Sequence, residues 1–259
     1  MKKILLSGLL FILFVTASCT SDGSPSASGG LKVASFREKI YVNGNLNSDY
    51  NFVFNYQDGK LVNVVRGTST IEFTYSGDKI TTSNIYVNDV LSSTTDYNYS
   101  GNLLTSIIYN AQDEKTDLIY SGNVLQSMKS SYLDGGTWIQ HQQNDYTFSN
   151  NNIQQKVRTN SDGSFAFSYK SSYDYDNANN PFRNMNPYLR LIVNFETIDI
   201  ISKNNVTKQY SYPSVGSTTP TLSHNYVIDY NADNYPVSVK KYLVSANELI
   251  AETVITYTE

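Results

Sequence analysis

Cys19 is the residue with the most specific potential chemistry, because it is the only cysteine among the 259 residues. A thiol can serve as a nucleophile, a metal ligand, half of a disulfide or an acceptor for lipid. A disulfide within the chain needs a second cysteine, so that role is excluded. Thr16, Ala17 and Ser18 are small and stand directly before Cys19, at the end of an apolar segment. This setting favours lipid attachment.

The first eighteen residues have the organisation of an export signal. Lys2 and Lys3 supply a positive start, and residues 4–15 are almost entirely apolar but shorter than the ~20 residues that cross a bilayer. The segment Val15-Thr16-Ala17-Ser18-Cys19 resembles the bacterial lipoprotein box, with Thr where Leu is commoner. The resemblance implies cleavage before Cys19, a diacylglyceryl thioether on its sulfur and an acylated amine. An ordinary secretory signal is the alternative.

Lipid on Cys19 makes a membrane the predicted partner. Each buried CH₂ contributes ~0.8 kcal/mol, so two or more acyl chains anchor stably where one does not. Thr20 stands where Asp would retain such a lipoprotein at the inner membrane. We therefore expect an outer-membrane location, and the sequence leaves open which face of that membrane. Residues 19–30 are mostly Ser, Gly, Ala, Asp and Pro, a composition typical of a flexible tether.

The remaining polar residues show no catalytic or metal-binding pattern. His141 and His224 are far apart in sequence and lack zinc-type spacing, so we expect each to be a surface strand residue. The segment 174–180 has a spacing reminiscent of a calcium loop but lacks its Gly and terminal Glu. Phosphate-binding and serine-nucleophile motifs are absent from the sequence. We therefore predict no catalytic residue, metal ligand or cofactor.

Aromatic residues are the other candidates for ligand contact. The chain has 22 Tyr, 11 Phe and one Trp, and Tyr suits a half-buried β surface with its ring packed and its hydroxyl wet. The functional alternative is a row of exposed rings that stacks on sugars or accepts a peptide. Trp138 follows the turn residues 134–137, so we expect it just past a hairpin tip. It is the candidate contact for a glycan, peptide or lipid ligand.

From about Leu31 the chain consists of repeated strand and turn signals. Each repeat has aromatics at i and i+2, which share one face of a strand, then a Gly or Asn turn and an apolar residue. The five clear copies turn at residues 57–59, 76–78, 100–102, 121–123 and 149–151, with degenerate copies at 173–177 and 228–233 and a further copy suggested around 209–212. A second set of turns lies at Asn88-Asp89, Asp134-Gly135-Gly136, Asp162-Gly163 and Ala246-Asn247.

Each repeat is therefore one hairpin, and seven or eight repeats predict an antiparallel meander of about 14–16 strands. Residues 177–187 contain two Asn-Pro pairs, each followed by an aromatic residue, which predict turns, and residues 212–220 form another loop. We interpret both as excursions from one sheet, with 189–201 as a longer strand or a short helix. Residues 31–259 then form one domain.

The repeat resembles the YD-type repeats of large β-shell proteins. It is more similar to Bacteroidota lipoproteins of unknown function, which combine such a meander with an insertion like Asn180-Pro181-Phe182. That family is described as having a porin-like, barrel-shaped fold, and the similarity covers most of residues 31–259. The resemblance implies no activity.

A meander of this size normally curls, closes or folds into two layers, and closure removes exposed edges. We predict an all-β barrel or half-barrel, with a β-sandwich as the alternative. A membrane-spanning barrel is disfavoured, because its outward positions need an apolar band and here alternate positions are mostly Asn, Asp, Ser, Thr and Lys.

Two functional hypotheses remain. Removing Lys2 and Lys3 takes the formal charge from −4 to −6, and no basic footprint for nucleic acid is present. The first hypothesis is a non-enzymatic binding or structural module held at the envelope. The second is a barrel whose interior binds a small or amphipathic ligand, or hydrolyses carbohydrate with inward carboxylates and aromatics. Clustered inward carboxylates with raised pKa values would favour the second.

Cys19→Ala tests the anchor. We expect the variant to lose both radiolabelled palmitate and membrane association, because the acceptor sulfur is gone. The measurement is fractionation of cells grown with labelled palmitate. A variant that stays membrane-bound with undiminished label would contradict the lipoprotein assignment.

Overall fold

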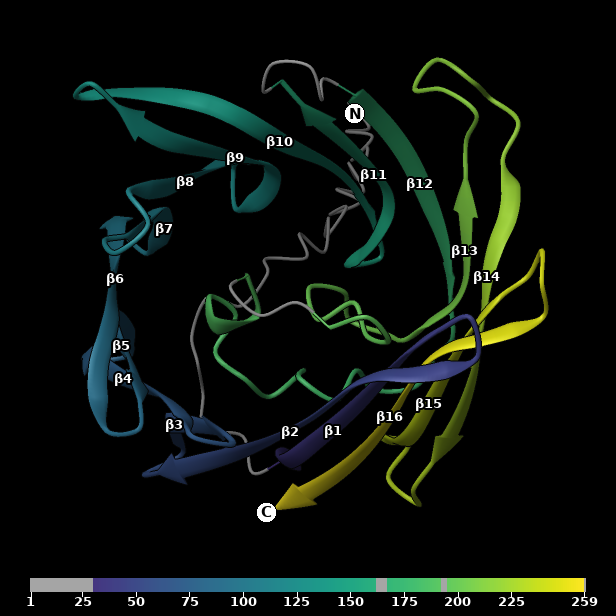
Figure 1. The fold of residues 1–259 in the computed structure, drawn as a ribbon, viewed down its shortest axis with the longest axis horizontal. Coiled ribbons are helices and arrows are strands. Elements are labelled where there is room, and N and C mark those ends of the chain that lie inside the picture. Colours follow the sequence, from purple (N-terminus) through teal and green to yellow (C-terminus); the bar gives the residue numbers. More distant parts are fainter. Residues whose placement is uncertain (1–29, 162–166, 192–194, 259) are drawn as a thin grey trace, which may run out of the picture.

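Sixteen antiparallel strands form a closed barrel in the computed structural model, which describes residues 30–161, 167–191 and 195–258 (Figure 1). The strands are β1 (Lys32–Val42), β2 (Asn45–Gln57), β3 (Lys60–Arg66), β4 (Ser69–Ser76), β5 (Lys79–Val87), β6 (Val90–Ser100), β7 (Leu103–Tyr109), β8 (Glu114–Ser121), β9 (Val124–Asp134), β10 (Thr137–Ser149), β11 (Asn152–Asn160), β12 (Phe167–Tyr175), β13 (Val206–Ser211), β14 (Thr221–Tyr230), β15 (Pro236–Leu243) and β16 (Glu248–Thr258).

Every strand pairs with its neighbours in sequence, and β1 also pairs with β16 from Lys32↔Thr258 to Ile40↔Ala251. The predicted meander of about 14–16 strands in a barrel is confirmed, and the half-barrel and sandwich alternatives are wrong. Closure gives the first and last strands a partner, so the described sheet has no unpaired edge.

The two rims of the barrel hold different sets of turns. Rim A holds the turns that join β2 to β3, β4 to β5, β6 to β7, β8 to β9, β10 to β11 and β14 to β15. These are the turns of the sequence repeat. Rim B holds the turns between the repeats, of which Asp162-Gly163 lies outside the described residues. At rim A, Asp58 and Gly59 have φ values of 50° and 78°, and Asn150 and Asn151 have 52° and 63°. Two consecutive positive φ values are the geometry of a type I′ hairpin turn.

The last aromatic of each repeat marks a β-bulge. The register shifts immediately before Tyr56, Tyr75, Tyr99, Tyr120, Phe148, Tyr175 and Tyr230, which end the seven copies identified in the sequence. A bulge bends its strand and increases the local twist. The repeat therefore supplies both the turn and the curvature that closure requires.

Tyr257 and Lys32 supply an eighth copy, split between β16 and β1. The Tyr257 hydroxyl donates a hydrogen bond to the carbonyl of Pro236 at 2.6 Å. In the same way, the Tyr75 hydroxyl donates to the carbonyl of Leu61 in the preceding hairpin at 2.8 Å. The Lys32 ammonium lies 5.5 Å from the centre of the Tyr56 ring, which is close to the 5.6 Å between Lys60 and Tyr75. The copy suggested around 209–212 is wrong, because β13 ends there at rim B.

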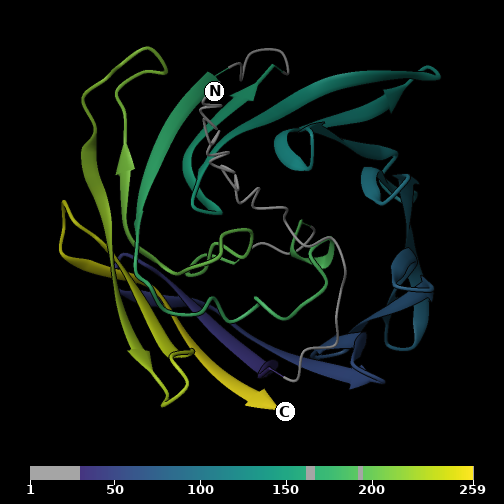
Figure 2. The same cartoon turned by 180° about the vertical axis from the view of Figure 1, so that it is seen from behind.

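Between β12 and β13, the described residues 176–191 and 195–205 enter the barrel, and we call them the plug (Figures 1 and 2). The predicted excursion at 177–187 is confirmed, but it turns inward. For 189–201 we predicted a longer strand or a short helix. Its described residues, 189–191 and 195–201, contain the short 3-10 helix η2 (Leu189–Leu191) and no strand. The loop at 212–220 joins β13 to β14 at rim B.

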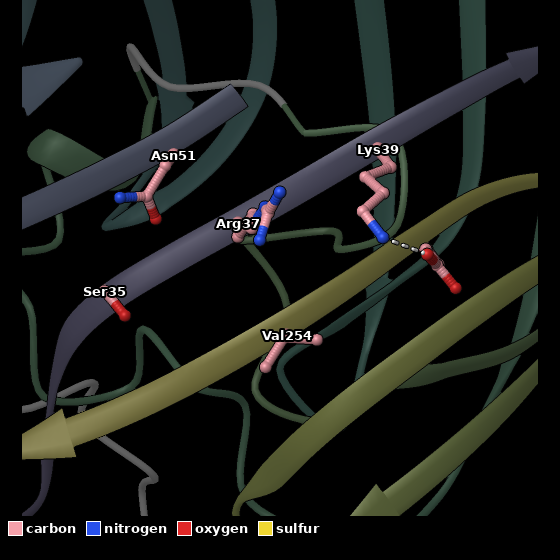
Figure 3. A pocket seen from close by; sticks show the side chains of 6 residues that line it. Ser35, Arg37, Lys39, Asn51 and Val254 are labelled. Carbon is pink, nitrogen blue, oxygen red and sulfur yellow. Dashed lines mark hydrogen bonds and ion pairs between the residues drawn. The ribbon is translucent and has the colours of Figure 1, made fainter. Parts of the chain in front are cut away.

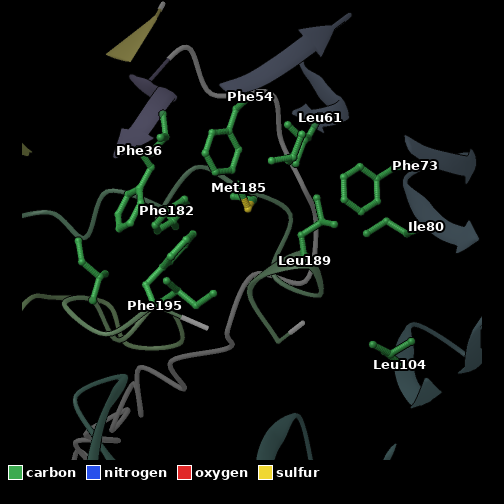
Figure 4. Packing of buried hydrophobic residues seen from close by; sticks show 14 of the residues in the cluster. Phe36, Phe54, Leu61, Phe73, Ile80, Leu104, Phe182, Met185, Leu189 and Phe195 are labelled. Carbon is green, nitrogen blue, oxygen red and sulfur yellow. The ribbon is translucent and has the colours of Figure 1, made fainter. Parts of the chain in front are cut away.

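The plug and the wall share one core (Figure 4). Leu61, Ile80 and Leu104, which follow the repeat turns, are buried on the wall. Plug residues Phe182 and Phe195 stack with ring centres 5.4 Å apart. The apolar inner face of a wide barrel is thereby covered by side chains from the inserted segment.

Phe182→Ala tests whether the plug carries the core. Phe182 is buried against Phe36, Phe54 and Phe195, so we expect its removal to lower the free energy of unfolding by ~3–5 kcal/mol. The measurement is urea denaturation followed by circular dichroism. The matched control is exposed Phe167→Ala, which should change that free energy by less than about 1 kcal/mol. Equal effects of both substitutions would contradict a core built on the plug.

Candidate functional site

Hydrogen bonds to rim A hold the plug in place. The Asn186 amide donates to the carbonyl of Asp78 at 3.1 Å, and the Asn184 amide donates to that of Leu31 at 2.8 Å. On the far side of the same rim, the Lys203 amide N–H donates to the carbonyl of Asn151 at 3.0 Å. The plug therefore spans rim A from the start of β1 to the β10–β11 turn.

Local hydrogen bonds explain how the plug keeps its irregular path inside the barrel. The side-chain oxygens of Asn180, Asn186 and Asp199 each accept the backbone N–H two residues later, at 3.0–3.1 Å. Such Asx turns replace the hydrogen bonds that a strand would provide. The Arg190 guanidinium donates to three carbonyls, those of residues 200–202, and burial lowers its pKa to about 10.

Glu38 connects the plug to the wall. Its Oε1 accepts the backbone N–H groups of Glu196 at 2.9 Å and Thr197 at 3.2 Å, together with the Thr197 hydroxyl at 3.2 Å. Burial raises the pKa of Glu38, against the opposing effect of these hydrogen bonds. Through Oε1, this side chain holds residues 196–197 of the plug against β1.

The half of the barrel near rim B is open to solvent, and we call this space the lumen. Tyr50, Tyr132 and Tyr169 point inward on β2, β9 and β12, yet they are 36–38% exposed. Inward residues near rim A, such as Ile80 and Leu104, are buried. The molecule is thus a cup, closed by the plug at rim A.

A cavity of about 220 Å³ lies between the plug and the wall formed by β2 to β7. Its apolar lining comes from both sides, with Phe54 and Phe73 on the wall and Met185, Leu189 and Phe195 on the plug (Figure 4). Its polar lining consists of Ser83, Ser93, Thr95, Tyr97, Tyr109 and Gln112.

The polar groups of the cavity are neutral. The Ser83 hydroxyl lies 3.0 Å from that of Tyr97, so the two share a hydrogen bond. Burial raises the pKa of the Tyr97 hydroxyl, which keeps it protonated. Among the described residues that line the cavity, none is Asp, Glu, His, Lys or Arg. Apolar walls with a few hydroxyls suit an uncharged or weakly polar part of a small molecule.

A second hollow lies on the outer face, where β1 meets β2 and β16 (Figure 3). Its charged groups already have partners. The Lys39 ammonium lies 2.9 Å from the Glu252 carboxylate, and the Arg37 guanidinium lies 2.6 Å from that of Asp49. This hollow is a network of ion pairs on the closing seam of the barrel.

Trp138 lies apart from the cavity. It stands one residue into β10, past the turn at rim B, and is 37% exposed. The Lys115 ammonium lies 5.3 Å from the centre of its ring, in cation–π contact. Contact with a ligand at Trp138 stays a prediction. Cys19, the signal of residues 1–18 and nearly all of the predicted tether lie outside the described residues.

Both histidines differ from the expectation of surface strand residues, because both are half-buried. Burial, with a further contribution from Lys241, lowers the pKa of His224 to about 4, so its ring is neutral at physiological pH. In the described part of the chain, no three His, Cys, Asp or Glu side chains are arranged to hold a metal. In the segment 174–180, Asp176 instead accepts hydrogen bonds from Asn205 and Ala178.

The cavity residues were not identified from the sequence. Ser83 pairs with Phe73 at the position where Val64 pairs with Phe54 and Ile107 with Tyr97 in other repeats. A small hydroxyl residue in place of an aliphatic one was a readable signal of open space on that face. The plug residues Met185, Leu189 and Phe195 gave no such signal, because their segment resembles a surface loop.

Comparison with known proteins supports the fold. No protein-family model matches the chain, and no curated protein matches it. A porin-like protein from Bacteroides uniformis is similar in structure, with a TM-score of 0.51 and 12% identity over 87% of this chain and 97% of that one. One from Bacteroides vulgatus has a TM-score of 0.51 and 12% identity over 88% and 99%. The porin-like, barrel-shaped fold implied by the sequence resemblance is confirmed.

Glu38→Gln tests the contact between wall and plug. Burial raises the pKa of Glu38 above its ordinary value of 4.5, so the folded chain keeps this proton to higher pH than the unfolded chain. The stability from this group is fully present below the unfolded pKa and is lost as pH rises through the raised pKa. Across this window we expect the free energy of unfolding of the wild type to fall relative to Glu38→Gln. The measurement is urea denaturation at a series of pH values.

Exposed Glu72→Gln is the control, and its profile should parallel that of the wild type. Parallel profiles for Glu38→Gln and the wild type would contradict the assignment of a raised pKa to Glu38.

Proposed function

We propose that this protein is an envelope lipoprotein, anchored through Cys19, whose barrel is a non-enzymatic cup that binds an apolar or amphipathic small molecule. The observation that carries the proposal is the cavity of about 220 Å³ between plug and wall. It combines apolar walls with neutral hydroxyls, and it adjoins a lumen that solvent enters at rim B. A preformed concave site of this composition is typical of small-ligand binding.

The outer face supports an anchored barrel over a spanning one. Ion pairs between Arg37 and Asp49, and between Lys115 and Asp117, lie on outward positions of the strands. A spanning barrel carries an apolar band outside and polar residues inside, and here aromatic residues fill the inside. Among the described residues, no helix has the length and apolar character needed to cross a bilayer.

The carbohydrate hydrolase alternative finds less support. A glycosidase needs two carboxyl groups that flank one bond of the substrate. Glu38 and Asp199 are two of the carboxylates that join the plug to its surroundings, and both accept hydrogen bonds. Glu38 accepts from residues 196–197, and Asp199 accepts from Tyr175 at 3.1 Å and from Ser202. Neither lines the cavity.

The anchor would join the barrel at its closed end. Leu31 lies at rim A, where its carbonyl accepts the Asn184 amide. The predicted tether of residues 19–30 ends next to this point. A lipid on Cys19 would therefore attach the membrane to the plugged side through a short flexible link, which leaves rim B free to face away.

Ser93→Trp tests the cavity as a binding site. Ser93 lines the cavity and is only half-buried, so a Trp there should fill the space with little effect on the core. We expect the dissociation constant for N-phenyl-1-naphthylamine, a neutral apolar dye, to rise at least about tenfold, equivalent to about 1.4 kcal/mol. The measurement is dye fluorescence with the chain from residue 20 onwards, which contains all sixteen strands and the plug.

The matched control is Ser92→Trp, because Ser92 is the exposed neighbour on the same strand. It should bind the dye like the wild type. Failure of the wild type to bind the dye, or equal loss in both variants, would overturn the assignment of the cavity as the binding site.

A further inference from the structure

A set of hydrogen-bond donors faces the barrel interior on β10, β11 and β12, on a different part of the wall from the cavity. We call it the donor patch, and it consists of Asn144, Tyr146, Lys156, Arg158, Tyr169 and Ser171. Arg158 is the direct cross-strand neighbour of Asn144 and Tyr169, and Lys156 is that of Tyr146 and Ser171. Directly opposed residues have Cβ atoms ~4.5–5.5 Å apart, so the six side chains form two adjacent rows on one face.

This face points inward. Tyr146 belongs to the core cluster, and Ser171 is buried. Residues two positions along a strand share its face, so Asn144 and Arg158 point the same way. Lys156 confirms the direction, because its ammonium lies 6.0 Å from the centre of the inward Tyr146 ring.

The two cations of the donor patch have no carboxylate partner. Within the ranges that the structure describes, neither Lys156 nor Arg158 forms an ion pair. Arg158 donates instead to the neutral amides of Asn160, at 3.1 Å, and Gln142. Its other N–H donors and its charge remain available. Burial lowers the pKa of Lys156, the Asp199 carboxylate of the plug opposes this effect, and the charge of Arg158 adds to it.

Asn144 adds an unsatisfied polar group. It is 8% exposed, and its Oδ1 has no hydrogen-bond partner among the described residues. Buried polar groups in proteins are normally hydrogen-bonded, and this oxygen is an acceptor, so it fits a ligand hydroxyl beside the two cations and not the oxyanion itself.

Other buried charges of the barrel are compensated by the protein itself. Lys241 pairs with Glu196 of the plug at 3.2 Å, Glu38 accepts three hydrogen bonds, and Arg190 donates to three carbonyls. A charge taken out of water without a partner is costly. The donor patch differs from these structural charges in that, among the described residues, neither Lys156 nor Arg158 has a carboxylate within ion-pair distance.

We propose that the donor patch binds the acidic group, a carboxylate or a phosphate, of an amphiphile whose apolar part occupies the cavity beside β2 to β7. This inference rests on the proposed function, because it assigns the chemical class of the same ligand. Charge-assisted hydrogen bonds from a guanidinium and an ammonium are the strongest available to an oxyanion, and Arg offers a two-donor fork. Both sites face the interior of one barrel, so the apolar part of the ligand would extend across that interior from β10–β12 to β2–β7.

The test compares dodecanoate, dodecyl phosphate and dodecanol as competitors of the neutral dye, below their micellar concentrations. We expect each anionic chain to bind the wild type at least about tenfold more tightly than dodecanol. Lys156→Met and Arg158→Gln should remove that advantage and leave the affinities for dodecanol and for the dye unchanged. Lys156→Arg keeps the charge and should keep most of the advantage.

The matched control is Lys208→Met, which removes one exposed charge from β13 and should leave the preference intact. Equal affinity of the wild type for dodecanol and the anionic chains would overturn the inference while leaving the proposed function standing. Binding of inorganic phosphate or acetate as tightly as the chains would also overturn it. Absence of binding by the dye and by every chain would instead reject the proposed function itself.

Discussion

The structure depends on covering the apolar inner face of a barrel that is too wide to fill itself. Eight-stranded barrels can be filled by their own side chains, whereas barrels of sixteen strands leave open space. Here the inner face carries Phe36, Phe54 and the aromatic rings of each repeat, so an open channel would expose them to water. The plug solves this by placing Phe182 and Phe195 between them, with the centres of the Phe36 and Phe195 rings 4.0 Å apart.

That solution makes the two ends of the barrel different. The plug is tied to rim A by side-chain and backbone hydrogen bonds, and Glu38 adds a link from the wall at mid-height. The half near rim B keeps inward rings that solvent reaches, among them Tyr50 and Tyr169. The cavity lies between the plug and the wall of β2 to β7.

The strands of the barrel wall could be predicted from the sequence repeat, whereas the arrangement of the interior depends on contacts between residues far apart in the sequence. Rings at i and i+2 followed by a Gly or Asn turn specify a hairpin with its apolar face defined, so the strand number and the barrel followed from the sequence. The inward position of the plug could not be predicted from the sequence, because its Asn and Pro residues form turns equally well inside or outside a barrel. Tyr257 was missed as the eighth copy because its partner, Lys32, stands at the other end of the chain. The donor patch was hidden for a similar reason, since Asn144, Arg158 and Tyr169 become neighbours only through strand register.

The wall and the plug differ in how far their residues can change without loss of the fold, which bears on the shape of the cavity. The wall is built from one repeated unit, whose residues are constrained by turns, bulges and inward rings. The plug occurs once, and Met185, Leu189 and Phe195 set one side of the cavity without taking part in any strand pairing. Substitutions at Met185 and Leu189 would reshape the cavity without removing a hydrogen bond of the sheet. Phe182 and Phe195 have no such freedom, because their rings stack on each other and pack against Phe36 of the wall. In the proposed function, Met185 and Leu189 would therefore govern ligand size, and the two phenylalanines the stability of the barrel.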